Sequence, residues 1–165
     1  MPSTAEIAEQ YFAAVGRQDI KGMTDCWQPG KRSRILGLAE LQAPEEIAEW
    51  FGNLFRAFPD FKFEVEKIIS DENMAAIHWS AKGTFDGLGT FEGFKPTGAR
   101  VAIEGIDVIK VEDGKIQSLV AAMNGLDLAR QIGAVPPAGS APDKALAAAF
   151  NAKTALVEQV KKLRS

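Results

Sequence analysis

The residue that could most directly do chemistry is Asp107, a carboxylate inside the apolar run of residues 101–111. An ionised carboxylate on an apolar surface is costly unless it is paired, protonated or used by a ligand. In the functional interpretation, Asp107 donates a hydrogen bond to a ligand carbonyl through a raised pKa, or acts as a base when ionised. In the structural interpretation, it accepts hydrogen bonds from a buried hydroxyl or amide, or pairs with an arginine.

Two further polar residues are candidates for catalysis. Tyr11, the only tyrosine, either presents its hydroxyl to a ligand or is a core aromatic with its hydroxyl at the rim. Asn124 either orients a ligand oxygen or caps the helix that follows it. A catalytic thiol at Cys26 would depend on His78, the only histidine, and we do not expect that pair. One cysteine and one histidine cannot supply the usual zinc ligands, so no metal is expected.

A predicted β-hairpin over residues 101–124 positions Asp107. The dipeptide Asp113-Gly114 lies between two apolar runs, which is the strongest short-range signal for a hairpin turn. With these two residues in the turn, a regular ladder pairs Asp107 with Val120.

Side chains alternate along a strand, so this register predicts which residues face inward. The inward face would carry Val101, Ile103, Gly105, Asp107, Ile109 and Val111 with Ile116, Ser118, Val120, Ala122 and Asn124. The small residues Gly105 and Ala122 either leave a cavity or allow close packing of a neighbouring aromatic. The residues predicted to contact a ligand are Trp27, Phe55, Trp79, Gly105, Val120 and Ala122.

The remaining pattern predicts helices first and then a run of strands. Helices are expected at 4–16, 19–27, 44–58, 126–132 and 143–163, and strands at 61–66 and 74–84. Residues 31–41 are ambiguous, with a short strand around 34–37. This order is typical of an α+β fold, in which a curved, mostly antiparallel sheet carries the N-terminal helices on its concave face. Such a cone-shaped α+β barrel encloses a natural small-molecule pocket.

Composition narrows the class of protein. The chain has 165 residues and a net charge of -3, and its length fits one compact domain. We expect this domain over residues 1–137, followed by a linker and a C-terminal amphipathic helix over 138–165. No basic patch predicts nucleic-acid binding, and no apolar run approaches the roughly 20 residues of a membrane span. No secretory signal is visible, and the single cysteine fits a reducing compartment, so we expect a cytoplasmic protein.

Several short segments, in their order and spacing, resemble the SnoaL-like polyketide cyclase (ester cyclase-like) families of the nuclear transport factor 2-like superfamily. These segments are Tyr11-Phe12-Ala13-Ala14 with Asp19, Pro44-Glu45-Glu46-Ile47, Phe58-Pro59-Asp60-Phe61, Ile77-His78-Trp79 with Gly83-Thr84, Pro96-Thr97-Gly98, Asp113-Gly114-Lys115-Ile116 and Leu128-Ala129-Arg130-Gln131-Ile132-Gly133. The resemblance implies a cone-shaped barrel, often a homodimer through the outer sheet face, and cofactor-free chemistry on carbonyl compounds.

The resemblance also assigns roles to individual residues. The acid/base aspartate of the cyclases maps to Asn124, whose amide cannot take a proton at useful pH. Ketosteroid isomerase, in the same superfamily, uses a helix-one tyrosine and a strand carboxylic acid as an oxyanion hole, and these match Tyr11 and Asp107. Two hypotheses follow: a cofactor-free cyclase or isomerase acting on an apolar carbonyl or polyketide-type substrate, or a protein that binds a small hydrophobic molecule without catalysis.

Overall fold

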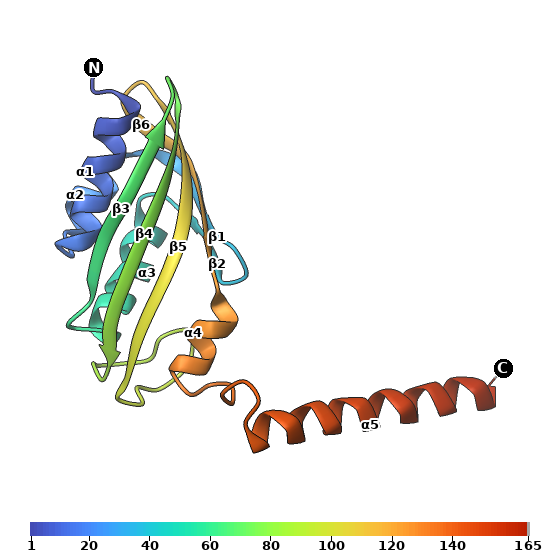
Figure 1. The fold of residues 1–165 in the computed structure, drawn as a ribbon. Helices are drawn as coiled ribbons and strands as arrows, with labels where there is room; N and C mark the ends of the chain where they lie inside the picture. The colour runs from blue at the N-terminus through green and yellow to red at the C-terminus, as the bar shows by residue number, and fades with distance from the viewer. Residues whose placement is uncertain (165) are drawn as a thin grey trace.

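The structure, a computed structural model that describes residues 1–164, is built around one curved sheet of six strands (Figure 1). In chain order the elements are α1 (Thr4–Gly16), α2 (Ile20–Asp25), β1 (Trp27–Ile35), β2 (Ala39–Gln42), α3 (Glu45–Ala57), β3 (Lys62–Ser70), β4 (Met74–Phe85), β5 (Ala99–Glu112), β6 (Lys115–Met123), α4 (Gly125–Gln131) and α5 (Ala141–Arg164). Helices α1, α2 and α3 lie on one face of the sheet, and α5 extends away from it (Figure 1). The expected α+β fold is confirmed.

The strand order is β2-β1-β6-β5-β4-β3, and every neighbouring pair is antiparallel except β1 with β6. The ambiguous residues 31–41 therefore belong to two strands, β1 and β2, that extend the sheet beyond the hairpin. The second helix ends at Asp25, earlier than expected, because Trp27 already pairs with Ile116 of β6.

Helix α1 is held against the sheet by its apolar side. Its start is defined by a capping box, in which the Ser3 hydroxyl accepts from the Glu6 N–H and the Glu6 carboxylate accepts from the Ser3 N–H. The stripe expected from sequence is buried, with Ile7, Tyr11 and Val15 all below a tenth exposed. This face places the Tyr11 side chain in the interior of the cone.

The β5–β6 hairpin has the expected turn but not the expected register. Glu112 pairs with Lys115 and Val111 with Ile116, yet Lys110 pairs with Ser118 because a β-bulge occurs there. A bulge inserts one extra residue into one strand and reverses the alternation beyond it. Asp107 is therefore opposite Ala121, and its predicted pairing with Val120 is wrong.

The shifted register corrects the inward face of β6. Leu119 and Ala121 are buried and Met123 is half-buried, whereas Ala122 and Asn124 are exposed. Val120, half-buried, pairs with Val108 on the outer face of the sheet. The predicted inward placement of Ser118, Val120, Ala122 and Asn124 is therefore wrong, and Val120 and Ala122, predicted to contact a ligand, do not line the interior cavity. The inward residues predicted on β5, including Asp107, face the interior.

Gly105 gives space to an aromatic ring and not to a cavity. A Cβ added at Gly105 would lie 2.7 Å from Cε2 of Trp79 and 2.8 Å from the carbonyl oxygen of Ala122. Gly105 pairs directly with Trp79 across the β4–β5 ladder. The close-packing interpretation of this glycine is therefore correct, and its predicted contact with a ligand is not supported.

We expect Gly105→Ala to lower the free energy of unfolding by about 1–3 kcal/mol, as overpacking of a filled core usually does. The strands would have to separate or the Trp79 ring rotate to admit the methyl group. Urea denaturation measures the change. Gly125→Ala is the matched control, because a Cβ there meets nothing within 4 Å; equal stability of the two variants would contradict this account.

Within residues 1–164, no helix is long and apolar enough to cross a membrane.

Candidate functional site

A cavity of about 90 Å³ lies between the inner face of the sheet and helices α1 and α3. Its lining is dominated by nine aromatic residues: Tyr11, Phe12, Trp50, Phe51, Phe58, Phe61, Phe63, Trp79 and Phe91. The few hydroxyl-bearing or charged side chains among the other lining residues are Ser33, Lys82 and Asp107. An apolar pocket with a few polar groups is the usual form of a small-molecule site.

Asp107 is the most unusual group in this cavity. It is 6% exposed, and its Oδ1 accepts a hydrogen bond of 2.8 Å from Nε1 of Trp79. Burial raises the pKa of the Asp107 carboxyl to about 7, while the hydrogen bond from Trp79 acts in the opposite direction. Within the described residues no cation pairs with it, and Oδ2 makes no hydrogen bond. One carboxyl oxygen is thus held in place and the other is available to a ligand.

Tyr11 lines the same cavity from α1. It is 2% exposed, and its ring packs edge-on against Phe12 and Trp27 with centroid separations of 5.0 and 6.2 Å. Burial and the nearby charge of Asp107 both raise the pKa of the Tyr11 phenol. The hydroxyl therefore remains a proton-bearing donor at neutral pH.

Trp27 supports Tyr11 from behind and does not line the cavity. The buried Nε1 of Trp27 has no hydrogen-bond partner among the residues described. An unpaired buried N–H is costly, so Trp27 packs its ring against Tyr11 at the expense of one unsatisfied donor outside the cavity.

Ser33 is a lining residue that the sequence interpretation missed. It is 3% exposed on β1, paired with Leu119, and its hydroxyl makes no hydrogen bond to the described residues. The neighbouring Arg32 and Arg34 face outward and form ion pairs with Glu40. The alternation of arginine with Ser33 is the available sequence signal, because residues 32–34 lie in strand β1.

Asn124 lies outside the cavity. Its side chain caps α4 by accepting a 3.0 Å hydrogen bond from the Asp127 N–H, and it is exposed. It borders a separate shallow depression with Glu104 and Asp127. The capping interpretation is therefore correct for the geometry.

The structure brings together three of the predicted site residues, Asp107, Tyr11 and Trp79. Phe55 is buried behind the cavity, where it packs on Phe51 and Phe61 with centroid separations of 5.8 and 5.7 Å. His78, which alternates with Trp79, lies on the outer face 3.6 Å from the Glu104 carboxylate. The chemistry that the cavity can support is therefore proton donation by a carboxyl and a phenol inside an aromatic shell.

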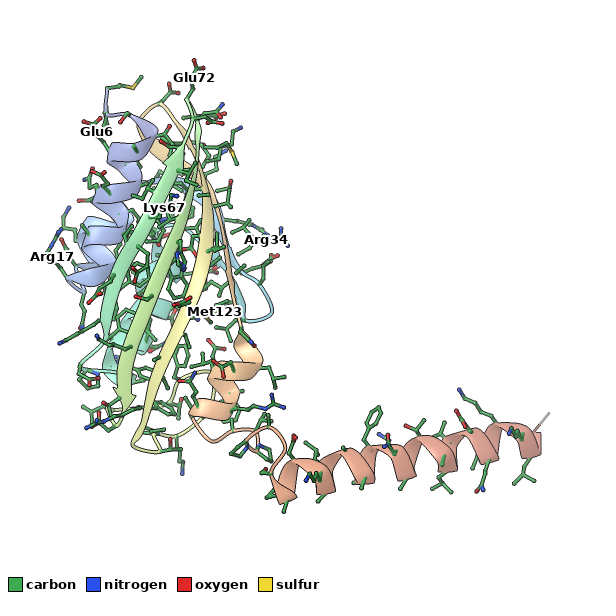
Figure 2. The ribbon with its side chains drawn as sticks, in the orientation of Figure 1. Glu6, Arg17, Arg34, Lys67, Glu72 and Met123 are labelled. Atoms are coloured by element: carbon green, nitrogen blue, oxygen red, sulfur yellow. The ribbon has the colours of Figure 1, made fainter. Side chains whose placement is uncertain are left out.

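Helix α3 and the loop of residues 86–98 contribute neighbouring aromatic side chains to the cavity lining. Trp50 donates a 2.8 Å hydrogen bond from Nε1 to Oε1 of Glu92, and Phe91 packs on Trp50 and Phe58. On the side of α4 the lining includes Met123, which Figure 2 shows at the end of β6.

The raised pKa of Asp107 predicts a pH-dependent stability. The folded pKa of about 7 lies above the ordinary value of 3.8, so between these values the folded state keeps a proton that the unfolded state loses. The contribution of this group is fully present below pH 3.8 and is lost as pH rises to about 7. In Asp107→Asn this loss should be absent.

Urea denaturation of wild type and Asp107→Asn across this pH range checks the expectation. The difference in unfolding free energy, variant minus wild type, should increase with pH and level off above about 7. Because other titrating groups are shared, they cancel in the difference. A difference independent of pH would show that the Asp107 carboxyl has an ordinary pKa.

Comparison with solved structures identifies proteins of the same fold. AclR, a candidate hydroxylase from Streptomyces galilaeus, is 25% identical with a TM-score of 0.67, over 79% of this chain and 95% of its own. A candidate SnoaL-like polyketide cyclase from Jannaschia sp. CCS1 is 20% identical with a TM-score of 0.70, over 80% and 92%. A protein of ketosteroid isomerase-like fold from Catenulispora acidiphila, in complex with trimethylamine, is 14% identical with a TM-score of 0.65, over 79% and 95%.

A comparison with curated proteins found no significant match. The family model described as SnoaL-like polyketide cyclase matches residues 5–132, from the second residue of α1 to the end of α4, and includes every lining residue of the cavity. Given this match and the shared fold, the chain belongs to the SnoaL-like polyketide cyclase family.

Proposed function

We propose that the protein is a cofactor-free enzyme that cyclises or isomerises an unsaturated, apolar carbonyl compound of polyketide type. The observation that carries this proposal is Asp107, a buried carboxyl with a pKa of about 7 and one oxygen without a partner in the described structure. Near neutral pH both of its protonation states are populated. That is the condition under which one group serves best as acid and base.

In the proposed step, the Asp107 carboxyl and the Tyr11 hydroxyl donate to the substrate carbonyl oxygen. As the new carbon–carbon bond forms, that oxygen takes the proton of Asp107. The attacking carbon enters the step as an enol, whose hydroxyl proton passes to the Asp107 carboxylate as the enol becomes a carbonyl, so the carboxyl is regenerated and no proton is consumed. The apolar surroundings strengthen both hydrogen bonds as negative charge develops on the oxygen.

The size and shape of the cavity favour a flat substrate. A volume of about 90 Å³ is well below the roughly 300 Å³ of pockets for drug-sized ligands. Aromatic rings line it on several sides, so an unsaturated ring could pack against them. A larger polyketide would require lining side chains to move.

A second candidate is a protein that binds a small hydrophobic molecule without converting it. The observation that favours this function is Asn124, which stands where the related cyclases place their aspartate and is engaged in capping α4. Apart from Asp107, no acidic or histidine side chain among the described residues lines the cavity. In this alternative, Asp107 and Tyr11 bind the carbonyl but transfer no proton.

Kinetics of Asp107→Asn and Tyr11→Phe test the enzymatic proposal with a panel of β-keto esters and unsaturated ketones. Loss of the acid should lower kcat about 100-fold or more, and loss of one oxyanion donor about 100-fold. His78→Gln, on the outer face, is the control and should match wild type. Product formation is followed by NMR.

Binding measurements on the same proteins separate the two candidates. Quenching of tryptophan fluorescence reports ligand entry, because Trp50 and Trp79 line the cavity. Binding without turnover by wild type across the panel would support the non-catalytic function. Turnover that is unchanged in Asp107→Asn would overturn the proposed catalytic role of Asp107.

A further inference from the structure

Ser33 is a polar residue on the inner face of β1, where its neighbours are apolar. It pairs with Leu41 of β2 and Leu119 of β6, and Ile35 follows it on the same face. All three neighbours are less than a tenth exposed, and Ser33 itself is 3% exposed. An alanine or valine would pack among them without burying a polar group, so packing does not explain the hydroxyl.

The Ser33 hydroxyl has no hydrogen-bond partner among residues 1–164. A side-chain polar atom that is both enclosed and without a partner does occur in this part of the chain, at Nε1 of Trp27. The Ser33 hydroxyl is not enclosed in this way, because it opens on the cavity that Ser33 lines. Its partner must therefore come from the contents of the cavity.

Ser33 differs in this respect from the other polar side chains of the lining. Lys82 is exposed, so water can satisfy its ammonium group. Asp107 and Tyr11 are the two donors that the proposed function directs at the reacting carbonyl. Ser33 remains as a buried hydroxyl with no assigned role, and a hydroxyl can both donate to and accept from a hydroxyl or carbonyl group of a ligand.

The sheet register sets Ser33 apart from Asp107. Ser33 pairs with Leu119, Leu119 pairs with Ile109, and Ile109 is two residues beyond Asp107 on β5. Two strand spacings and two residue steps place the Cα atoms of Ser33 and Asp107 about 12 Å apart. Each hydrogen bond to a ligand spans about 2.8 Å, so the two residues suit ligand oxygens roughly 6 Å apart. A single carbonyl oxygen cannot contact both residues.

We infer that Ser33 is a specificity-determining residue that binds a second oxygen of the substrate, a hydroxyl or carbonyl group across the ring from the reacting carbonyl. The inference rests on the proposed function, because it takes the reacting carbonyl to be held by Asp107 and Tyr11. It narrows the substrate class to unsaturated ring compounds that carry oxygen at both ends. The aromatic lining of the cavity then packs against the ring between the two oxygens.

Two ketones that differ by one hydroxyl group provide the test. 1-Tetralone and 6-hydroxy-1-tetralone share a ring system, and the second carries its hydroxyl across the aromatic ring from the carbonyl. Calorimetry on the full-length protein measures the dissociation constant of each. Wild type should bind the hydroxylated ketone about tenfold more tightly, as expected for one buried hydrogen bond. In Ser33→Ala this preference should be lost, with the two constants within about twofold of each other.

Ser118→Ala is the matched control for the loss of a serine hydroxyl. Ser118 belongs to the neighbouring strand β6, but it is exposed and does not line the cavity. Its variant should keep the wild-type preference for the hydroxylated ketone.

A second pair of variants separates the hydroxyl of Ser33 from the shape of its side chain. Threonine and valine have nearly the same shape, so Ser33→Thr and Ser33→Val change the cavity volume alike. The preference should be retained in Ser33→Thr and lost in Ser33→Val. A wild type without a preference, a preference retained in Ser33→Ala, or equal preferences in the threonine and valine variants would overturn the inference.

Tyr11→Phe separates failure of this inference from failure of the proposed function. Loss of the phenol hydroxyl should weaken binding of both ketones by a similar factor, about tenfold, and leave the preference unchanged. If Tyr11→Phe weakens both but Ser33→Ala keeps the preference, the inference fails and the proposed carbonyl contact stands. If Tyr11→Phe binds both as wild type does but Ser33→Ala loses the preference, the carbonyl contact fails and Ser33 keeps its role. Binding of neither ketone by wild type would overturn both.

Stability without ligand distinguishes a ligand contact from a structural one. Because the Ser33 hydroxyl bonds to no described residue, the urea midpoint of Ser33→Ala should not fall below that of wild type. A lower midpoint would show that the hydroxyl is bonded within the protein and would overturn the inference.

Discussion

The hydrogen bond between Trp79 and Asp107 is the interaction on which the interior depends. A carboxyl buried in an aromatic shell needs a donor, and the indole N–H supplies one at 2.8 Å without adding a charge. The ring reaches that position only because Gly105, its partner across the ladder, has no side chain. A neutral donor satisfies one oxygen yet leaves the pKa of the Asp107 carboxyl raised to about 7. An arginine in its place would have kept the group ionised.

The same arrangement links stability to chemistry. Because burial raises the pKa of the Asp107 carboxyl, this group lowers the stability of the folded protein at neutral pH. Tyr11 lies in the same interior, where burial, with the nearby charge of Asp107 as a second cause, raises the pKa of its phenol and keeps it protonated. Two donors with different acidities face one cavity, while Ser33 adds a hydroxyl from β1. In the proposed function, Asp107 and Tyr11 act on a single carbonyl.

Much of this fold follows from local sequence patterns, and the departures have local causes. The helix at Thr4–Gly16, the Asp113-Gly114 turn and the inward face of β5 were all predictable from periodicity and turn residues. The β-bulge was not, since the sequence around Gln117 alternates acceptably in either register. One extra residue therefore moved Val120 and Ala122 to the outer face. Ser33 was missed because β1 is short of apolar residues and pairs in parallel with a distant strand.

The sequence by itself determined that a carboxyl would lie on the apolar face of β5, because strand alternation is a local property. It also determined the SnoaL-like fold, through short segments whose order suits one curved sheet. Only the tertiary structure decided what surrounds the carboxyl: Trp79 as donor, Tyr11 as neighbour, and Asn124 as a helix cap away from the cavity. Those contacts join residues far apart in the chain. Their geometry depends on strand register and sheet curvature, which no local pattern specifies.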